Sequence, residues 1–178
     1  MESTRPAEPQ DIDRLLELAG LAREELLLER GGTLWAERES PVHPRRVELL
    51  DAMTDTDRLL VLGCVEEYPA GFGLIGQQTL RNGDKLAVVS DIYVEPGFRG
   101  VSVGEAVMTD LMAWARDRGC IGVDSLVLPG MRDSKNFFER FTLKARALIV
   151  HHSFAEPPEP PEPPEPSAEP HPAVEADR

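Results

Sequence analysis

The chain has 178 residues, of which 41% are hydrophobic and 29% charged, a composition typical of a single globular domain. It carries 32 acidic residues against 19 Lys and Arg, so its formal net charge at pH 7 is −13. Phosphate backbones attract basic proteins, and this charge therefore argues against a nucleic-acid partner. The longest apolar stretch, residues 59–65, is far shorter than the roughly 20 residues of a transmembrane helix, so no membrane span is expected.

The N-terminus has no apolar segment of the kind found in secretory signals, and we expect a cytoplasmic protein. Cys64 and Cys120 should then be reduced, and their apolar neighbours indicate buried structural thiols. The His residues are not spaced from these cysteines as zinc ligands would be, so no metal site is expected.

The first third of the chain predicts three helices. An amphipathic helix is indicated by apolar residues at i, i+3, i+4 and i+7, namely Ile12, Leu15, Leu16 and Ala19. A second helical segment covers about residues 21–30 and ends at Gly31 and Gly32, where a C-terminal cap fits. A third helix should begin at Pro44.

Three strands should follow as an antiparallel meander. Residues 59–65 and 71–80 are predicted to pair around a turn at residues 66–70. The Asn-Gly pair at Asn82 and Gly83 predicts a tight turn into a third strand, residues 86–94.

The second half predicts a helix–strand–helix–strand unit. Its elements are a helix over residues 103–119, a strand over 123–128, a helix over 133–141 and a last strand over 145–151. Helices, a meander and this unit together predict an α+β or α/β layered domain, with helices packed on a mixed sheet.

Residues 155–178 differ in composition from the rest of the chain. They contain nine of the 16 prolines and repeat the triplet Glu-Pro-Pro, which can neither form a hydrogen-bonded ladder nor bury apolar surface. We expect a disordered, polyproline-like tail after a domain at residues 3–154. The alternative is a ligand for a proline-recognising groove, although the repeat has no basic anchor.

The segment at residues 88–104 carries the most chemical information. A strand runs through a glycine-rich turn directly into a helix, and such a helix start offers free N–H groups and a positive dipole end to a pyrophosphate. Arg99 adds a charge at the mouth of the turn, while Gly100 and Gly104 let the backbone approach a ligand closely. The segment fits neither a Walker loop nor a dinucleotide fingerprint.

This segment resembles the Gln/Arg-x-x-Gly-x-Gly/Ala signature of the GNAT superfamily of N-acetyltransferases. Arg99 and Gly104 match the signature, and Ser102 replaces its central glycine. The predicted order of elements over residues 3–154 also resembles a GNAT domain. The resemblance implies a mixed, mostly antiparallel central sheet with helices on both faces.

The late helix supports the resemblance and departs from it at two positions. Residues 135–143 resemble the family pattern Ala-x-x-Leu-Tyr-Glu-x-x-Gly-Phe. Phe138 occupies the place of the tyrosine that protonates the leaving thiolate in many members. Thr142 occupies the place of the glycine that ends the helix.

The resemblance implies acetyl-CoA as co-substrate. Backbone groups of Ile92, Tyr93 and Val94 would pair with its pantetheine arm, and one of their N–H groups could polarise the thioester carbonyl. Its pyrophosphate would lie on the loop and helix start, whose residues are Arg99, Gly100, Val101, Ser102, Val103 and Gly104. Arg132 is either a further contact to the CoA phosphates or an exposed surface arginine.

The candidate general base is Asp91. Strand alternation places Asp91 and Tyr93 on one face, where the carboxylate could take a proton from the acceptor ammonium directly or through water. The alternative is a buried carboxylate satisfied by backbone amides or an arginine. Glu66 and Glu67 are other candidate bases, although two acids in a turn are typically solvated.

The main functional hypothesis is transfer of an acetyl group to a primary amine by direct attack in a ternary complex, without a metal. The chain's acidity favours a cationic acceptor, and the family resemblance suggests a possible homodimer paired through the last strands. One alternative is a non-catalytic acyl-CoA-binding or regulatory module of the same fold. The other is an interaction protein that acts through its proline-rich tail.

Overall fold

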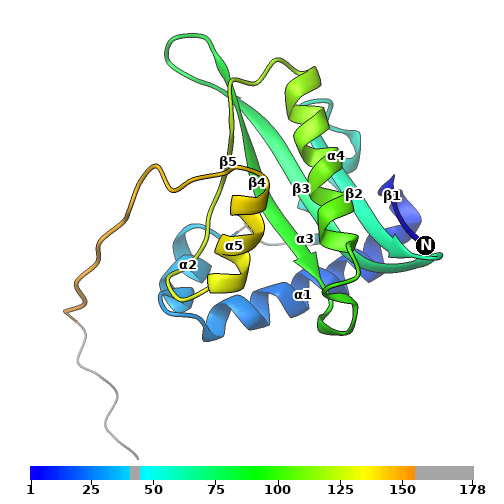
Figure 1. Ribbon diagram of the computed structural model, residues 1–178, viewed down its shortest axis with the longest axis horizontal. Coiled ribbons are helices and arrows are strands. Elements are labelled where there is room, and N and C mark those ends of the chain that lie inside the picture. Colours follow the sequence, from blue (N-terminus) through cyan, green and yellow to red (C-terminus); the bar gives the residue numbers. More distant parts are fainter. Residues whose placement is uncertain (41–44, 155–178) are drawn as a thin grey trace, which may run out of the picture. The chain divides into compact units, whose positions relative to one another are not determined.

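The computed structural model describes residues 1–40 and 45–154, and its contacts divide the chain into the units Met1–Lys144 and Ala145–Arg178. The first unit contains a five-stranded sheet in the order β1-β2-β3-β4-β5 (Figure 1). The strands are β1 (Glu2–Pro6), β2 (Arg58–Val65), β3 (Tyr68–Thr79), β4 (Lys85–Val94) and β5 (Val123–Ser125). Neighbouring strands are antiparallel except β4 and β5, which are parallel.

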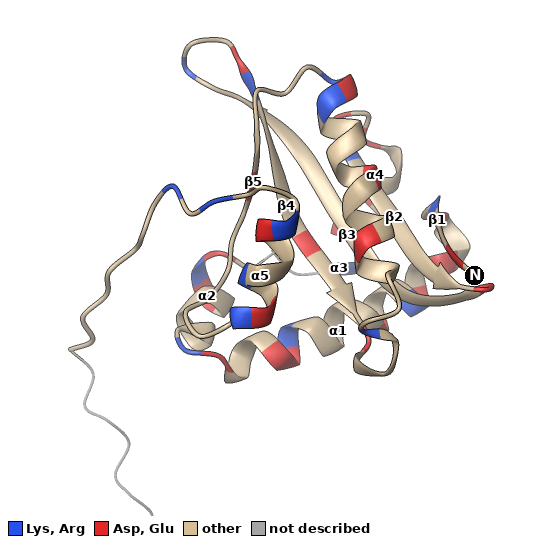
Figure 2. Ribbon diagram, in the orientation of Figure 1, with Lys and Arg blue, Asp and Glu red and all other residues tan. Residues whose placement is uncertain are grey.

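Helices cover both faces of this sheet, as predicted. They are α1 (Ile12–Leu28), α2 (Gly32–Arg38), α3 (Arg45–Thr54), α4 (Val103–Asp117) and α5 (Arg132–Arg140), with short 3-10 turns η1 (Pro9–Asp11) and η2 (Pro96–Phe98). Acidic and basic residues lie side by side along α1 and α5, a pattern typical of helices with a solvent-facing side (Figure 2).

Alternation along the strands divides the apolar residues between two cores. On one face, Leu62 and Leu74 pack against α1 and α3. On the other, Val61 and Ile75 pack against α4. Glycine is needed at Gly63 and Gly73, because a Cβ at either position would lie 2.5–2.7 Å from the Val103 or Val107 side chains of α4.

The N-terminal elements differ from the prediction. Residues 12–28 form one helix rather than two, since the burial of Leu15 and Leu18 offsets the roughly 1 kcal/mol that Gly20 costs inside a helix. The short helix α2 and the strand β1 were not predicted. β1 is a polar edge strand whose place depends on pairing with β2, which its own sequence does not reveal.

The C-terminal strands are shorter than predicted or absent. β5 covers only Val123–Ser125, because its ladder with β4 ends there. The strand expected over residues 145–151 is wrong: residues 145–154 form no helix or strand. The exposed fractions of Leu148, Ile149 and Val150 are 88%, 70% and 93%. Apolar, β-branched residues become a strand only beside a neighbour that supplies a ladder.

The boundaries of three further predicted segments remain to be described. The turn between β2 and β3 consists of Glu66 and Glu67 alone, so β3 begins earlier than predicted. The predictions that a helix starts at Pro44 and that residues 155–178 are disordered concern residues outside the described part of the chain. Over the part that is described, no helix has the length and apolarity needed to cross a membrane.

Candidate active site

The sheet opens between β4 and β5. Their parallel pairing comprises only Ala87 with Val123, Val88 with Asp124 and Val89 with Ser125. Ser90 then forms a bulge in β4, because Leu74 of β3 pairs with Asp91 while its neighbour Ile75 pairs with Val89. Beyond this bulge β4 continues to Val94 beside β3 alone, so its other edge has no strand partner among the described residues.

A cavity of about 550 Å³ lies at this opening. Asp91, Ile92 and Tyr93 of β4 line it, together with Ser125 at the end of β5 and Phe138 of α5. Residues of α1 and α3 close its opposite side. The cavity therefore offers both an unpaired strand edge and room for a small acceptor, as ligand sites usually do.

Asp91 projects toward α3, on the face that alternation predicted. Its Oδ1 accepts a hydrogen bond from Arg45 Nη2 at 2.5 Å, and its Oδ2 accepts one from Ser90 Oγ at 2.9 Å. Burial alone would lower the pKa of Arg45, but the carboxylates of Asp91 and Glu48 outweigh it and raise that pKa. Asp91 is thus satisfied by an arginine, as its alternative interpretation held, and it also lines the cavity.

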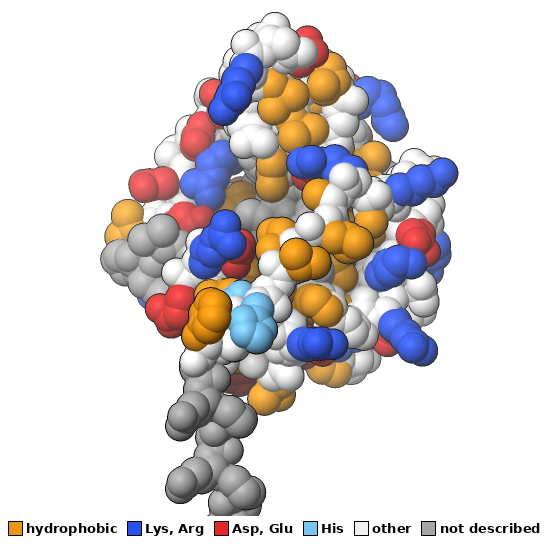
Figure 3. All heavy atoms as spheres, turned by 90° about the vertical axis from the view of Figure 1, so that its left-hand side faces the viewer, with side chains coloured by type: hydrophobic (Ala, Val, Ile, Leu, Met, Phe, Trp, Pro, Cys, Tyr) orange, Lys and Arg blue, Asp and Glu red, His pale blue; other side chains and the backbone are white. Residues whose placement is uncertain are grey.

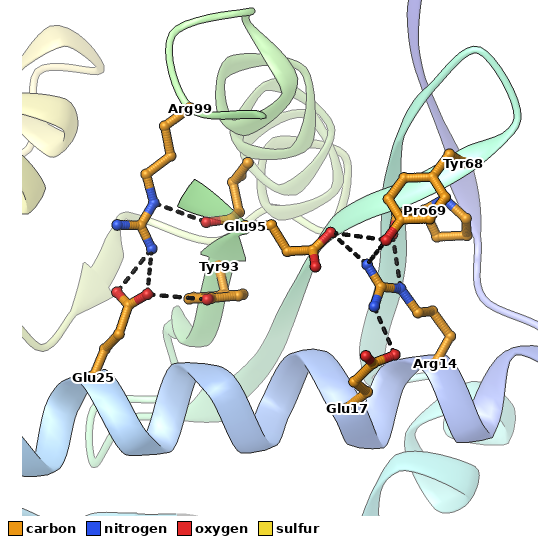
Figure 4. Close-up of polar contacts among 9 residues, drawn as sticks. Arg14, Glu17, Glu25, Tyr68, Pro69, Tyr93, Glu95 and Arg99 are labelled. Carbon is orange, nitrogen blue, oxygen red and sulfur yellow. Dashed lines mark hydrogen bonds and ion pairs between the residues drawn. The ribbon is translucent and has the colours of Figure 1, made fainter. Parts of the chain in front are cut away.

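Tyr93 and Arg99 meet the same carboxylate of α1 (Figure 4). Glu25 Oε1 accepts hydrogen bonds from Tyr93 Oη at 3.0 Å and from Arg99 Nη2 at 2.9 Å. Arg99 Nε also donates to the carbonyl of Val94 at 2.8 Å. Burial, reinforced by the hydrogen bond to Glu25, raises the pKa of Tyr93 to about 12, so the phenol remains protonated at neutral pH.

The turn before α4 presents a run of free amides. The N–H groups of residues 100–105 have no hydrogen-bond acceptor in the described part of the chain, and the first amide bonded into the helix is that of Ala106, to Ser102. Gly100, Val101 and Ser102 are exposed, so this run is open to solvent. Such a set of amides at the positive end of a helix fits a phosphate group.

Ser102, at the central glycine position of the signature, has a left-handed backbone conformation. Its φ is 61° and its ψ is 5°, in the left-handed region. Gly104 faces the next helix of the site: a Cβ there would lie 3.4 Å from the Phe137 ring and 3.5 Å from Val94. Ser102 thus has a conformation that glycine adopts without strain.

Thr142, at the other glycine position of the family patterns, also has a positive φ. Its φ is 65°. Its N–H donates to the carbonyl of Glu139 at 2.9 Å, and the N–H of Leu143 donates to that of Phe138 at 3.1 Å, which is the Schellman pattern at a helix end. This cap fixes the end of α5 that places Phe138 in the cavity wall, where the ring is 7% exposed.

Two arginines of α5 lie at opposite ends of the helix. Arg132 is exposed at its first residue, eight positions or about 12 Å along the helix from Arg140. Arg140 Nη1 donates to Glu105 in the first turn of α4 at 2.7 Å. The geometry therefore favours the surface-arginine interpretation of Arg132 and puts Arg140, which the sequence did not single out, beside the free amides.

The remaining candidates lie apart from this constellation. Glu66 and Glu67 are exposed in the β2–β3 turn and do not line the cavity. Cys64 is buried and Cys120 partly buried, and both are free thiols. Across residues 1–40 and 45–154 no group of His, Cys, Asp and Glu could hold a metal ion.

Comparison with known proteins identifies the family. The acetyltransferase (GNAT) family model matches residues 23–142. A glucosamine 6-phosphate N-acetyltransferase of Trypanosoma brucei brucei is 29% identical over 72 residues, 40% of this chain and 47% of the relative. An aminoglycoside N(6')-acetyltransferase type 1 of Stenotrophomonas maltophilia is 28% identical over 92 residues, 49% of this chain and 58% of the relative. The chain spans about half the length of the curated relatives it matches.

A solved structure supports the same conclusion for the fold. AAC(6')-Iy in complex with the bisubstrate analogue CoA-S-monomethyl-acetylneamine is similar with a TM-score of 0.63 and 15% sequence identity, over 86% of this chain and 97% of that one. The family model covers more than half of the chain, and the matched residues include the open edge of β4 and the free amides before α4. The chain belongs to the acetyltransferase (GNAT) family.

Proposed function

We propose that this protein is an N-acetyltransferase that transfers an acetyl group from acetyl-CoA to a primary amine by direct attack in a ternary complex. The observation that carries the proposal is the unpaired edge of β4 next to the free amides of residues 100–105. The names of the relatives support it. Amino-sugar amines, which both relatives' names indicate, are the first acceptors to test.

The residues of this site fit acetyl-CoA, which when bound supplies the acetyl group as a reactive thioester. Backbone groups of Ile92, Tyr93 and Val94 would hold the pantetheine arm as an added strand would be held. Amides from Gly100 to Gly104 would hold the pyrophosphate, and Arg99, whose charge is shared with Glu25, would offer its remaining N–H donors at the mouth of the turn. An N–H group of the β4 edge would also stabilise negative charge that develops on the carbonyl oxygen.

Asp91 would receive the acceptor ammonium. Its carboxylate lies in the cavity wall, held in place by Arg45 and Ser90. Carboxyl groups titrate several pH units below alkylammonium groups, so a carboxylate orients the amine and relays its proton to water rather than storing it.

Phe138 has no hydroxyl to offer a leaving thiolate. Thiols have pKa values near 8.5 and leave far more readily than alcohols or amines, so protonation by water is sufficient. The absence of this hydroxyl also motivates the second candidate function, a non-catalytic acyl-CoA-binding module. The third, interaction through the proline-rich tail, concerns residues outside the described part of the chain. We also propose a homodimer in which the exposed apolar residues 148–150 form the contact between the two chains.

Calorimetry with acetyl-CoA tests the binding half of the proposal. Val101 is 43% exposed in the amide run, so Val101→Glu places a negative charge beside the phosphates without disturbing the core. We expect at least a tenfold loss of affinity for Val101→Glu and little change for the neutral, equally long Val101→Gln. Equal affinities in the two variants would contradict the phosphate site.

Thiol release with a panel of primary amines tests the chemical half. We expect Asp91→Asn to lower kcat roughly 100-fold while acetyl-CoA affinity is kept. Glu48→Gln is the matched control, because it also removes one of the two carboxylates that Arg45 contacts. Equal losses in the two variants would assign Asp91 a structural role, and acetyl-CoA binding without thiol release for any amine would favour the non-catalytic module.

A further inference from the structure

The charges in the cavity wall have the opposite sign to those of the chain as a whole. Among the described lining residues are three arginines, Arg23, Arg45 and Arg46, and a single acid, Asp91. The whole chain carries a net charge of −13. The face drawn in Figure 3 carries hydrophobic, basic and acidic side chains together, so the excess of positive charge is a property of the cavity wall and not of that whole face. This local excess of positive charge needs an explanation of its own.

Arg45 is already committed within the protein. Its side chain is 10% exposed and forms ion pairs with both Glu48 and Asp91 at 2.5 Å. Its charge is therefore neutralised by its neighbours, and it positions Asp91 rather than a ligand.

Arg23 is not neutralised in this way. It projects from α1 into the cavity wall, where its Nη1 donates to Ser40 Oγ at 3.0 Å. No carboxylate of the described residues lies within ion-pair distance of it. A guanidinium has five N–H donors, so Arg23 retains donors for an anion and can present two of them side by side.

Arg46 is only weakly held. It pairs with Asp13 of α1, but the side chains of the two residues are 50% and 84% exposed. Solvent screens such a pair strongly, and its contribution to stability is close to zero. An anion in the cavity can therefore compete for Arg46 at little cost.

We infer that the acceptor carries an anionic group, a phosphate or a carboxylate, in addition to its amine, and that Arg23 and Arg46 bind this group. The inference rests on the proposed function, since it names the class of amine that the cavity takes. The ammonium lies toward Asp91 and the anion toward the two arginines, so the cavity matches both ends of a dipolar ligand. The acidity of the whole chain, which favours a cationic acceptor, acts at long range and does not describe this wall.

A set of ligands built on one ring tests the inference. The set comprises glucosamine, glucosamine 6-phosphate, glucosaminuronic acid and 2,6-diamino-2,6-dideoxyglucose, which differ only in bearing a hydroxyl, a phosphate, a carboxylate or an ammonium at carbon 6. Binding is read from the fluorescence of Trp35, which lines the cavity, in a Trp114→Phe background that removes the chain's other tryptophan. Thiol release with acetyl-CoA is measured separately.

We expect glucosamine 6-phosphate or glucosaminuronic acid to bind at least tenfold more tightly than glucosamine, with the diamine weakest. The tighter of the first two identifies the anion. Arg23→Met should reduce the preference for the anionic ligand about tenfold or more. Arg81→Met, an equal charge change at an exposed turn outside the cavity, should leave it unchanged.

The outcomes separate the inference from the proposed function. Tight diamine binding, equal binding of all four ligands, or a preference that Arg23→Met does not reduce would overturn the inference, even if thiol is released. Anion-dependent binding without thiol release for any ligand would leave the ligand class standing and overturn the transferase proposal.

Discussion

Ser102 and Thr142 have a backbone conformation that glycine favours. The family patterns have glycine at both positions, and the two residues have positive φ, at 61° and 65°. A left-handed conformation costs an L-residue roughly 1–2 kcal/mol, with the β-branched threonine the more strained of the two. The sequence revealed both departures from the family patterns, but not that both residues would have positive φ.

We therefore predict that Thr142→Gly stabilises the protein by about 1 kcal/mol, because it removes this strain at the cap of α5. Urea unfolding measures the change. Thr109→Gly is the matched control, since Thr109 lies within α4 and the same substitution there should destabilise by about 0.3 kcal/mol. A destabilising Thr142→Gly would show that the threonine side chain makes a contribution larger than the strain.

The Tyr93 phenol provides a spectroscopic test of the contact with Glu25. In a Tyr68→Phe background Tyr93 is the single tyrosine, and absorbance near 295 nm should titrate with a midpoint of about 12. Glu25→Gln should lower the pKa of Tyr93, because it removes the negative charge that accepts the phenol's hydrogen bond. The burial of Tyr93, which also raises this pKa, is unchanged. The neighbouring Glu24→Gln should not change it.

The same shift implies a loss of stability at high pH. The pKa of Tyr93 is about 12 in the folded state and near 10 in the unfolded state, so unfolded chains ionise first. The contribution of Tyr93 to stability is complete below pH 10 and is lost as the pH rises to 12. A free energy of unfolding that rises across this window would contradict the assignment.

The side-chain partners at the site were not predictable from local sequence. Strand alternation correctly placed Asp91 and Tyr93 on one face, because the period of a strand is a local property. Their partners Arg45 and Glu25 come from helices that are 46 and 68 positions away in the chain. Only the packing of those helices on the sheet brings the groups together.

Helix α1 contacts the strands and the turn of the site through two separate groups of side chains (Figure 4). In one, Glu25 binds Tyr93 and Arg99. In the other, Arg14 Nε donates to the carbonyl of Pro69 at 3.0 Å and its Nη2 to Tyr68 Oη at 2.8 Å, and it pairs with Glu95 after β4. The helix thus restrains both β3 and the start of the turn that carries the free amides.

Arg14→Met should accordingly lower the free energy of unfolding by about 1–3 kcal/mol. The side chains of Arg14 and Glu95 are only 17% and 19% exposed, and the substitution leaves the Glu95 carboxylate without its charge partner. Arg46→Met is the control: its pair with Asp13 is exposed, and its loss should cost less than about 0.5 kcal/mol. Denaturant unfolding of both variants makes the comparison. Similar costs would mean that the α1 contacts contribute no more than surface pairs.

At the level of elements, helices and strands were predicted correctly where the sequence pattern of the segment alone determines its structure. The predictions were wrong where a segment forms a strand only by pairing with a distant one. The strands β2, β3 and β4 and the helix α4 follow from periodicity and turn residues. β1 was missed because its polar sequence becomes a strand only beside β2, and the strand predicted over residues 145–151 is wrong because these residues join no ladder of the described sheet. A glycine cannot by itself divide a helix whose buried face continues past it, as Gly20 shows in α1.

For the whole molecule, both core clusters are contained in Met1–Lys144. A chain that ends at Phe154 should therefore melt within about 2 °C of the full chain and bind acetyl-CoA with the same affinity. Differential scanning calorimetry and titration calorimetry check this. A melting temperature lowered by more than about 5 °C would show that residues 155–178 contribute to the stability of the domain.

The free amides before α4 also determine how the rate of association with a polyanionic ligand depends on ionic strength. The chain's charge of −13 repels such a ligand at long range, whereas the amides carry no net charge and attract only at contact. Salt at 0.1 M shortens the range of the repulsion to about 10 Å and affects the contact far less. Association should then become faster as salt is added while dissociation changes little, which is the reverse of the behaviour of phosphate sites built from lysines.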